Sequence, residues 1–321
     1  MLTEPKIYAA LDLGTNNCRL SIVASSNNNY KILDRYSKNV RLGQGLDASG
    51  NLSNEAMDRA IHAIKVCKDK LDGYNIYKKR YVTTEACRIA QNTDVFLSKV
   101  YDATGLELEI IDYRTETELA VIACGDLMRT VKKPVILFDI GGGSLQLAII
   151  KQPCTIANNI DAILGLPLGV VTMLEKFNNV NNQVANFYEM KNYAKSLIYD
   201  TIDKYNLNKY LDIGDCYLFG TSGTATTLAG LYLNLPRYDR KKIDGLWLYR
   251  KDVLNVIDRL LSWDIVKRKA SPCIGKGRAD LVIAGCSILN AIMEIWSGDK
   301  VRVADRGLRD GILIQLMQNK E

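Results

Sequence analysis

The sequence predicts an α/β protein with two domains of related topology, each holding a mixed sheet. Its 321 residues exceed the usual size of a single domain. Apolar residues recur with strand periodicity in some segments and with helical periodicity in others. One unusual unit, a strand followed by an Asp-Gly loop and a second strand, occurs at Asp12 and again 127 residues later at Asp139. Its repetition indicates that the chain contains two related halves.

The first half opens with three short apolar runs separated by turns, IYAALDLG, CRLSIVAS and YKILDRYS, which are typical of consecutive antiparallel strands. A helix is expected to begin at Ser53, because serine caps helices and apolar residues follow at helical spacing. The order then continues with a strand over RYVTTEA, a helix from about Arg88, a strand over LELEIID and a helix from about Thr115 to Cys124.

The second half repeats this opening, since VILFDIGGGSLQLAIIK again predicts strand, loop and strand. A helix is predicted over roughly 183–206. CYLFGTSGTATTLAG predicts a strand, a Gly-rich turn and a helix, and the C-terminal part is predicted to be helical through DRGLRDGILIQLM. These elements place the domains at residues 1–126 and 127–321, with the last helix a candidate to pack back on the first domain.

The composition favours a cytoplasmic protein and excludes several classes of function. No run approaches the roughly 20 apolar residues of a membrane span, and the N-terminal residues do not resemble a secretory leader. The eight cysteines show neither CxxC nor metal-ligand spacing, so they are expected to be reduced and mostly buried. His62 is the only histidine and lies in a helical pattern, which excludes sites built on several histidines.

Positive charge is concentrated between residues 231 and 280. This segment holds twelve Lys or Arg residues against six Asp and no Glu, so it alone accounts for the net charge of +6. A local positive field favours a polyanionic partner such as a phosphate chain, a nucleotide or a nucleic acid. A solvated basic face without a ligand is the alternative.

The first loop, Asp12–Asn17, has the composition of a ligand-binding turn. Gly14 permits a tight turn that brings backbone N–H groups near a ligand, and the short polar side chains after it add donors. The aspartate could hold a metal ion or orient water. Because CRLSIVAS is a strand rather than a helix, P-loop and dinucleotide-binding families are disfavoured. An ordinary turn is the alternative for this loop taken alone.

Two further loops have the same character. The loop Asp139–Ser144 contains three consecutive glycines, each costing roughly 1 kcal/mol relative to alanine in regular structure, which indicates close backbone approach. The loop Gly220–Thr224 lies between a strand and a helix, where a helix N-terminus can capture an anion. The sequence therefore predicts that the loops at Asp12–Asn17 and Asp139–Ser144 hold a phosphate chain between them.

Two strand-loop-strand units in a duplicated α/β chain resemble the actin-like ATPase superfamily, whose ribonuclease H-like domains bind phosphates in the cleft between them. More narrowly, the chain is similar to the exopolyphosphatase and guanosine pentaphosphate phosphatase family, in a short two-domain form. Actins and sugar kinases do not carry TTEACR followed by an acidic helix start. The resemblance extends over nearly the whole chain and rests on ALDLGTNNCRLSIV, NVRLGQGL, TTEACRIAQN, EIIDYRTETELAV, FDIGGGS, GLPLGVV, FGTSGT, GRADLVIAG and ADRGLRDGIL.

The resemblance implies the roles of individual residues. Glu116 takes the position of the family's general base, with Glu118 as a nearby rival, and Arg88 that of its phosphate-binding arginine, with an ion pair to Glu85 as the alternative. The implied catalytic residues are Glu116, Arg88 and Asp139. The implied metal ligands, for Mg²⁺ or Mn²⁺, are Asp12, Asp139 and Gln146. The expected substrate-binding residues are Gly14, Thr15, Asn16, Asn17, Arg19, Gly141, Gly142, Gly143, Ser144, Gly220, Ser222, Gly223 and Thr224.

Two positions depart from the family pattern. Gln146 stands where the family usually has a glutamate that forms part of the metal-bearing end of the site. A neutral amide still offers an oxygen ligand but no charge, so weaker metal binding or lower activity is expected. Asn17 stands where the family prefers serine, and it keeps the ability to form hydrogen bonds.

Three functions within the resemblance stay open. The first is an exopolyphosphatase acting on inorganic polyphosphate, the second is a guanosine pentaphosphate 5′-phosphohydrolase, and the third is a catalytically weak polyphosphate or alarmone-binding protein, for which Gln146 is the main reason. An ATP-dependent kinase or ATPase would instead need an adenosine pocket near residues 220–230. A nucleic-acid partner is not expected, and the oligomeric state, including a homodimer, is open.

Overall fold

The computed structural model describes residues 5–26, 29–151, 160–177 and 183–318. The chain divides into two compact units: unit 1 comprises residues 1–123 and 308–321, and unit 2 comprises residues 124–307. The division falls inside helix α5 (Tyr113–Met128), the helix that also contains the boundary expected after residue 126. The last helix, α13 (Leu308–Gln318), belongs to unit 1.

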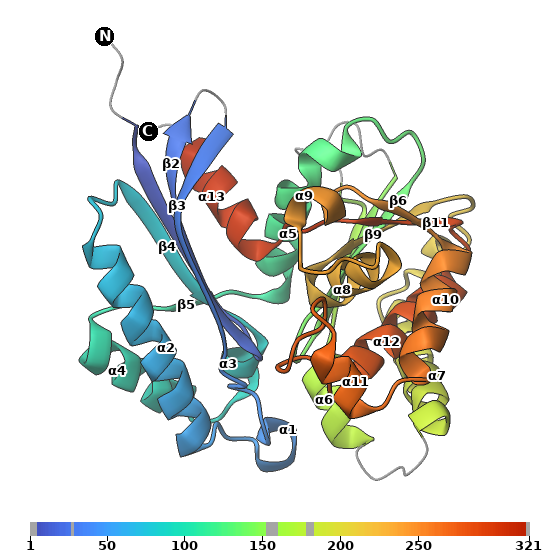
Figure 1. Cartoon of the computed structure of the whole chain (residues 1–321), viewed down its shortest axis with the longest axis horizontal. Coiled ribbons are helices and arrows are strands. Elements are labelled where there is room, and N and C mark those ends of the chain that lie inside the picture. Colours follow the sequence, from blue (N-terminus) through green and yellow to red (C-terminus); the bar gives the residue numbers. More distant parts are fainter. Residues whose placement is uncertain (1–4, 27–28, 152–159, 178–182, 319–321) are drawn as a thin grey trace. The chain divides into compact units, whose positions relative to one another are not determined.

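Unit 1 is a mixed sheet with helices on both faces. Helices α2 and α4 lie on one face and α13 on the other (Figure 1). The strands follow the order β3-β2-β1-β4-β5, in which β1 pairs antiparallel with β2 and parallel with β4. The elements are β1 (Ile7–Leu13), β2 (Asn17–Ser26), β3 (Asn29–Asn39), α1 (Leu46–Ser49), α2 (Asn54–Asp72), β4 (Lys78–Thr83), α3 (Glu85–Ile89), α4 (Thr93–Thr104), β5 (Glu109–Ile110), the first part of α5, and α13.

The residues of strand β1 explain why both faces of this sheet are covered. Successive side chains of a strand point to opposite faces. Leu11 packs in the core that includes Ile64 of α2, whereas Ala10 packs in a second core that includes Ile312 of α13. By the same alternation, the side chain of Asp12 leaves the sheet on the α13 face.

Unit 2 repeats this architecture with one strand added. Its sheet has the order β10-β11-β9-β6-β7-β8, and β6 pairs antiparallel with β7 and parallel with β9. The predicted duplicated α/β fold is therefore confirmed. The elements are β6 (Val135–Ile140), β7 (Leu145–Ile150), β8 (Ala162–Leu166), α6 (Val170–Lys176), α7 (Gln183–Lys204), a 3₁₀ turn (Asn208–Tyr210), β9 (Tyr217–Thr221), α8 (Ser222–Tyr232), α9 (Arg240–Ile243), β10 (Trp247–Tyr249), α10 (Arg250–Leu261), α11 (Ile265–Ala270), α12 (Val282–Ile295) and β11 (Lys300–Val303).

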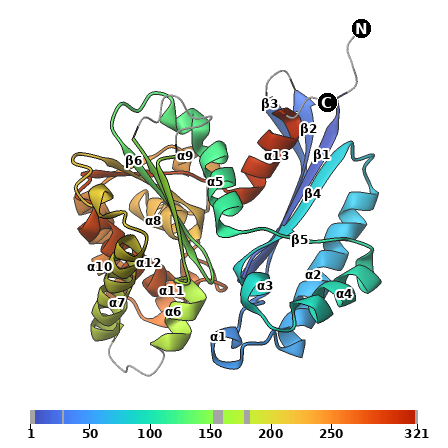
Figure 2. The ribbon, with the colours of Figure 1, turned by 180° about the vertical axis from the view of Figure 1, so that it is seen from behind.

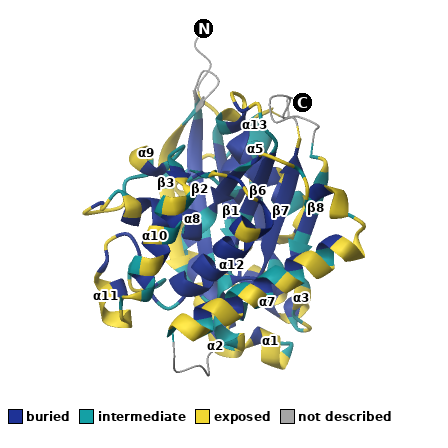
Figure 3. Ribbon diagram, turned by 90° about the vertical axis from the view of Figure 1, so that its right-hand side faces the viewer, coloured by how far each residue is buried: buried dark blue, intermediate teal, exposed yellow. Residues whose placement is uncertain are grey.

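Helix α12 is the centre of the core of unit 2. All of its residues except Glu294 are buried, as its dark colour in Figure 3 shows. It packs beside α7, which Figure 2 shows running along it. A helix that is apolar all round is stable only inside a protein core or a membrane. Among the helices of the described ranges, none is both long enough and apolar enough to cross a membrane.

Several predicted element boundaries are wrong. The strand over RYVTTEA ends at Thr83, and the next residues form the short helix α3, which already contains Arg88. Helix α5 begins at Tyr113 rather than Thr115, because the Asp112 side chain caps it by accepting from the Thr115 amide at 2.7 Å. The C-terminal part is not wholly helical, since β10 and β11 lie within it. Both strands are short and pair across about fifty residues, which local periodicity does not reveal.

The cysteines of the described residues are buried and form no disulfide bond among themselves, as expected. The sulfur atoms of Cys18 and Cys67 lie 3.9 Å apart. Cys154 lies outside the described residues.

We predict that Gly311→Ala destabilises unit 1. A Cβ atom on Gly311 of α13 would lie 2.0 Å from the carbonyl oxygen of Leu119 in α5, which is rigid backbone. Helix propensity alone would make alanine stabilising by up to about 1 kcal/mol. Overpacking should reverse that sign and lower the free energy of unfolding by about 1–3 kcal/mol in urea denaturation.

Gly307→Ala is the matched control. A Cβ at Gly307 would meet nothing within 4 Å. Its free energy of unfolding should stay within about 0.5 kcal/mol of the wild type. A Gly311→Ala protein as stable as the Gly307→Ala protein would contradict the packing of α13 on α5.

Candidate active site

The two Asp-Gly loops are built on the same hairpin geometry. The Gly14 amide donates to the Asn17 carbonyl at 2.9 Å, and the Gly141 amide donates to the Ser144 carbonyl at 2.8 Å. The register that results pairs Asp12 with Arg19 in unit 1 and Asp139 with Gln146 in unit 2. Paired residues of neighbouring strands point to the same face. Each aspartate therefore stands beside one residue from the strand after its loop, a cation in unit 1 and an amide in unit 2.

A hydroxyl forms a hydrogen bond to each hairpin at an equivalent point, from the last residue of β4 in unit 1 and from the first residue of α8, directly after β9, in unit 2. Thr83 donates to the Leu13 carbonyl at 3.0 Å, and Ser222 donates to the Ile140 carbonyl at 3.0 Å. Ser222 holds this bond with a left-handed backbone, φ 67°. A non-glycine residue pays about 1 kcal/mol or more for that conformation, and such strain gathers at functional sites.

The backbone of the first loop is hydrogen-bonded to the segment that follows β3. The Asn16 carbonyl accepts from the amides of Val40 and Arg41, and the Thr15 carbonyl accepts from the Gly43 amide. Thr15 and Asn16 are each only 6% exposed. Among the described residues, the buried Asn16 Oδ1 has no hydrogen-bond partner. The loop backbone is therefore fixed before any ligand arrives.

The glycines of the second loop allow another part of the chain to approach. The carbonyls of Gly141 and Gly142 accept from Val170 at 3.0 Å and from Val171 at 2.8 Å. A Cβ atom on Gly169 would lie 2.2 Å from the Gly142 oxygen. Part of the close approach predicted for these glycines is therefore made by the start of α6, not by a ligand. The amides of Val170 and Val171 occupy two carbonyl acceptors of the loop.

The third loop forms the N-terminus of α8. Gly223 lies in its first turn, where backbone N–H groups have no intrahelical acceptor. The Arg278 guanidinium covers this turn, since a Cβ on Gly223 would lie 3.3 Å from its Nη1 atom. Thr224 has a different position, because its hydroxyl faces Gly285 of α12 and only 8% of the residue is exposed. Gly220 packs against the Phe138 ring.

Arg88 and Glu116 lie in direct contact. The Arg88 Nη1 atom is 2.8 Å from Glu116 Oε2, and the Arg88 Nη2 atom is 2.7 Å from Glu85 Oε2. These three side chains are 13–15% exposed. Burial alone would lower the pKa of the Arg88 guanidinium, but the charges and hydrogen bonds of Glu116 and Glu85 outweigh it and raise that pKa. Glu118 is 48% exposed and lies near Arg114 instead.

The expected metal ligands provide few oxygen donors. Asp139 and Gln146 are register partners, and the buried Gln146 donates from Nε2 to Ser144 Oγ at 2.6 Å. Asp12 lies in unit 1. Within the described ranges no group of three or more His, Cys, Asp or Glu side chains is arranged as a metal site. Magnesium often binds through only one or two carboxylates plus substrate phosphates and water, and within unit 2 the pair of Asp139 and Gln146 fits that mode.

Sequence reasoning missed two arginines. Arg278 lies within the motif GRADLVIAG but was counted only as part of the basic segment. Arg309, at the start of α13, donates to Ser21 Oγ at 3.1 Å on the face where Asp12 emerges. Burial and the nearby charge of Arg19 lower its pKa to about 10, partly offset by Asp310 and Asp12. The sequence signal for Arg309 is its place in ADRGLRDGIL, one of the stretches that carry the family resemblance.

Some cations of the basic segment 231–280 form hydrogen bonds within unit 2. Arg268 is buried and donates to Gln183 Oε1 at 2.7 Å. Arg259 donates to the Asn234 side chain at 2.9 Å and to the Leu231 carbonyl. These cations connect α10 and α11 to α7 and to the end of α8 within unit 2. The segment therefore offers less free positive charge than its composition indicates.

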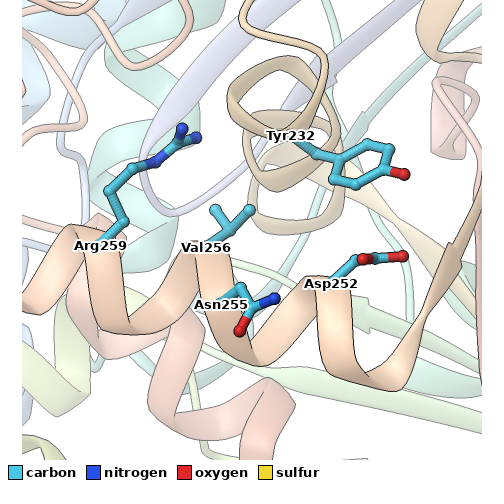
Figure 4. A pocket seen from close by; sticks show the side chains of 5 residues that line it. All are labelled: Tyr232, Asp252, Asn255, Val256 and Arg259. Carbon is cyan, nitrogen blue, oxygen red and sulfur yellow. The ribbon is translucent and has the colours of Figure 1, made fainter.

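A cavity of about 280 Å³ opens between α8 and α10. Figure 4 shows its lining, Tyr232 from the end of α8 and Asp252, Asn255, Val256 and Arg259 from α10. It contains none of the predicted site residues. It lies at the C-terminal end of α8, whereas the third loop forms the N-terminal end.

The chain is similar in sequence to known proteins over nearly its whole length. Exopolyphosphatase 2 of Mycobacterium tuberculosis is 26% identical, with 96% of this chain and 98% of that protein covered. Guanosine-5′-triphosphate,3′-diphosphate pyrophosphatase of Vibrio atlanticus is 28% identical over 98% of this chain, which spans 60% of that longer protein.

The fold is likewise shared with a solved structure. A Ppx/GppA family member from Aquifex aeolicus superposes with a TM-score of 0.77 at 25% identity, covering 98% of this chain and 99% of that one. The sequence profile of the family matches residues 21–320. With that match over almost its whole length, the chain belongs to the Ppx/GppA phosphatase family.

Proposed function

We propose that this protein is an exopolyphosphatase, which transfers the terminal phosphoryl group of inorganic polyphosphate to water. The oxygen of water attacks the terminal phosphorus, the bond from that phosphorus to the bridging oxygen breaks, and the shortened polyphosphate leaves with the bridging oxygen, while the terminal phosphorus becomes orthophosphate. Such a reaction depends on positioning and on neutralising charge more than on covalent catalysis. The full-length similarity to an exopolyphosphatase supports this choice.

The observation that carries the proposal is the Arg88–Glu116 contact of 2.8 Å in unit 1. Helix α5 places Glu116 in its first turn, and the short helix α3 brings Arg88 to it. We propose that the Glu116 carboxylate accepts the proton of the attacking water. Arg88 orients that carboxylate and offers a donor to the terminal phosphate.

The loops act as donors to the phosphate chain in this proposal. In unit 1 the donors are the amides and side chains of residues 15–17, together with Arg19. In unit 2 they are the N–H groups of Gly142, Gly143 and Ser144 and the first turn of α8 at Ser222 and Gly223. Arg278, which covers that turn, adds a fixed positive charge.

We propose Mg²⁺ or Mn²⁺ as the cofactor. In unit 2, Asp139 and the Gln146 amide oxygen would hold the ion together with phosphate oxygens, and in unit 1 Asp12 stays a predicted ligand. When bound, the ion offsets the charge of the phosphates. A cytoplasmic location belongs to the proposal, and free cysteines in the described residues suit a reducing compartment. A homodimer also stays a prediction.

Guanosine pentaphosphate is the second candidate substrate, because the Vibrio atlanticus relative is as similar as the exopolyphosphatase. Phosphate release from polyphosphate and from guanosine pentaphosphate should be measured with Mg²⁺ and with Mn²⁺. The proposal expects a higher kcat/KM for polyphosphate. Equal or higher kcat/KM for guanosine pentaphosphate would make the second candidate the function. Binding of either compound without any phosphate release would favour a non-catalytic sensor.

We predict that Glu116→Gln lowers kcat by about 10²-fold or more, since removing a general base typically costs that much. Polyphosphate binding should persist, because the amide keeps the shape of the carboxylate. Phosphate-release assays and calorimetry would separate the two effects. Glu118→Gln is the comparator, as Glu118 is exposed and lies 3.9 Å from Arg114. If Glu118→Gln loses activity and Glu116→Gln does not, the general base is Glu118.

We predict that Gln146→Glu lowers the Mg²⁺ concentration needed for half-maximal activity. The change adds a carboxylate beside Asp139, and magnesium prefers charged oxygen ligands. The carboxylate would be only about as exposed as Gln146, which is 1% exposed, so the variant should be less stable without metal. Metal titrations of activity and of thermal stability would check both effects. If the Mg²⁺ concentration needed for half-maximal activity does not change, residue 146 is not a ligand of the ion.

A further inference from the structure

Arg88 has almost all of its donors occupied within unit 1. Its Nη1 atom donates to the Ile111 carbonyl and to Glu116 Oε2, both at 2.8 Å. Its Nε and Nη2 atoms donate to the same oxygen, Glu85 Oε2, at 3.0 and 2.7 Å. A guanidinium has five N–H donors. One N–H, on Nη2, is therefore left without an acceptor among the described residues.

The cluster of Glu85, Arg88 and Glu116 carries an excess of negative charge. Two carboxylates face one guanidinium, and all three side chains are largely buried. A phosphate that reaches Arg88 meets this net charge rather than a free cation. To receive a second donor from Arg88, the phosphate must displace Glu85 from the Nε–Nη2 edge.

The short helix α3 fixes Glu85 in this place. Glu85 and Arg88 are three residues apart, so their side chains lie on the same side of the helix. The amides of Cys87 and Arg88 both donate to the Thr84 carbonyl, which closes the turn. Glu85 is thus held on one edge of the guanidinium while Glu116 and Ile111 take the other end.

We propose that Glu85 is a positioning residue that competes with the substrate phosphate for Arg88 and so keeps Arg88 bound to Glu116. The proposal deepens the proposed function and rests on it for the role of Glu116. With Glu85 ionised, the guanidinium is oriented toward the base and binds phosphate weakly. Without that charge, Arg88 is free to turn its Nε–Nη2 edge to the phosphate. Affinity then rises while the base loses its partner.

The test compares Glu85→Gln, Glu85→Asp and the wild type in two measurements, the Kd for tripolyphosphate and kcat for phosphate release. Charge-assisted hydrogen bonds are about twice as strong as neutral ones, so Gln holds Arg88 less firmly. Glu85→Gln should lower Kd about fivefold or more and lower kcat about tenfold or more. Glu85→Asp keeps the charge and should return both values toward the wild type. This opposed change is not expected from a loss of folding.

Glu107→Gln is the matched control, because Glu107 is an exposed glutamate of unit 1 and its loss changes the net charge equally. Its Kd and kcat should stay within about twofold of the wild type. The proposal is overturned if Glu85→Gln behaves like Glu107→Gln, or if its Kd rises. If the wild type binds tripolyphosphate without releasing phosphate, hydrolysis fails, while tighter binding by Glu85→Gln still supports the competition. If the wild type binds no tripolyphosphate, both proposals fail.

Discussion

Each half of the candidate site depends on one backbone hydrogen bond, from a loop glycine to the carbonyl three residues later. Those bonds, at Gly14 and Gly141, set the register of the two central hairpins. A shift of one residue would send every side chain of the following strand to the opposite face. Asp12 and Asp139 would then face residues of the core. The pairing of Asp12 with Arg19 and of Asp139 with Gln146 follows from this register.

The two units provide different chemistry on the same scaffold. At the end of β4, unit 1 carries the short helix α3, whose arginine is held between two glutamates. At the equivalent end of β9, unit 2 carries the longer helix α8, whose first turn is covered by Arg278. The first arrangement suits proton transfer, and the second suits the binding of anions. In the proposed function, the element that follows this strand distinguishes the roles of the two units.

The sequence predicted the duplicated fold and both hairpins because their signals are local: alternating apolar residues interrupted by an Asp-Gly loop. It could not show that Glu85 and Glu116 share Arg88, since that contact depends on how α3 meets α5. The contact of Arg309 could not be predicted from local sequence, because its partner Ser21 is 288 positions away. Strands β10 and β11 are too short for a periodic pattern and are defined only by their pairing with the sheet.

The return of α13 to unit 1 has a consequence for synthesis on the ribosome. Unit 2 is continuous in sequence, so all of its strands and helices are available once residue 307 has been made. The core around Tyr8, Ala10 and Val82 lacks its cover until Leu308, Ile312 and Leu313 follow. The part of unit 1 that precedes unit 2 in the chain is therefore completed by a helix that follows unit 2. Until residues 308–313 have been made, one apolar face of the first sheet lacks helix α13, which covers it.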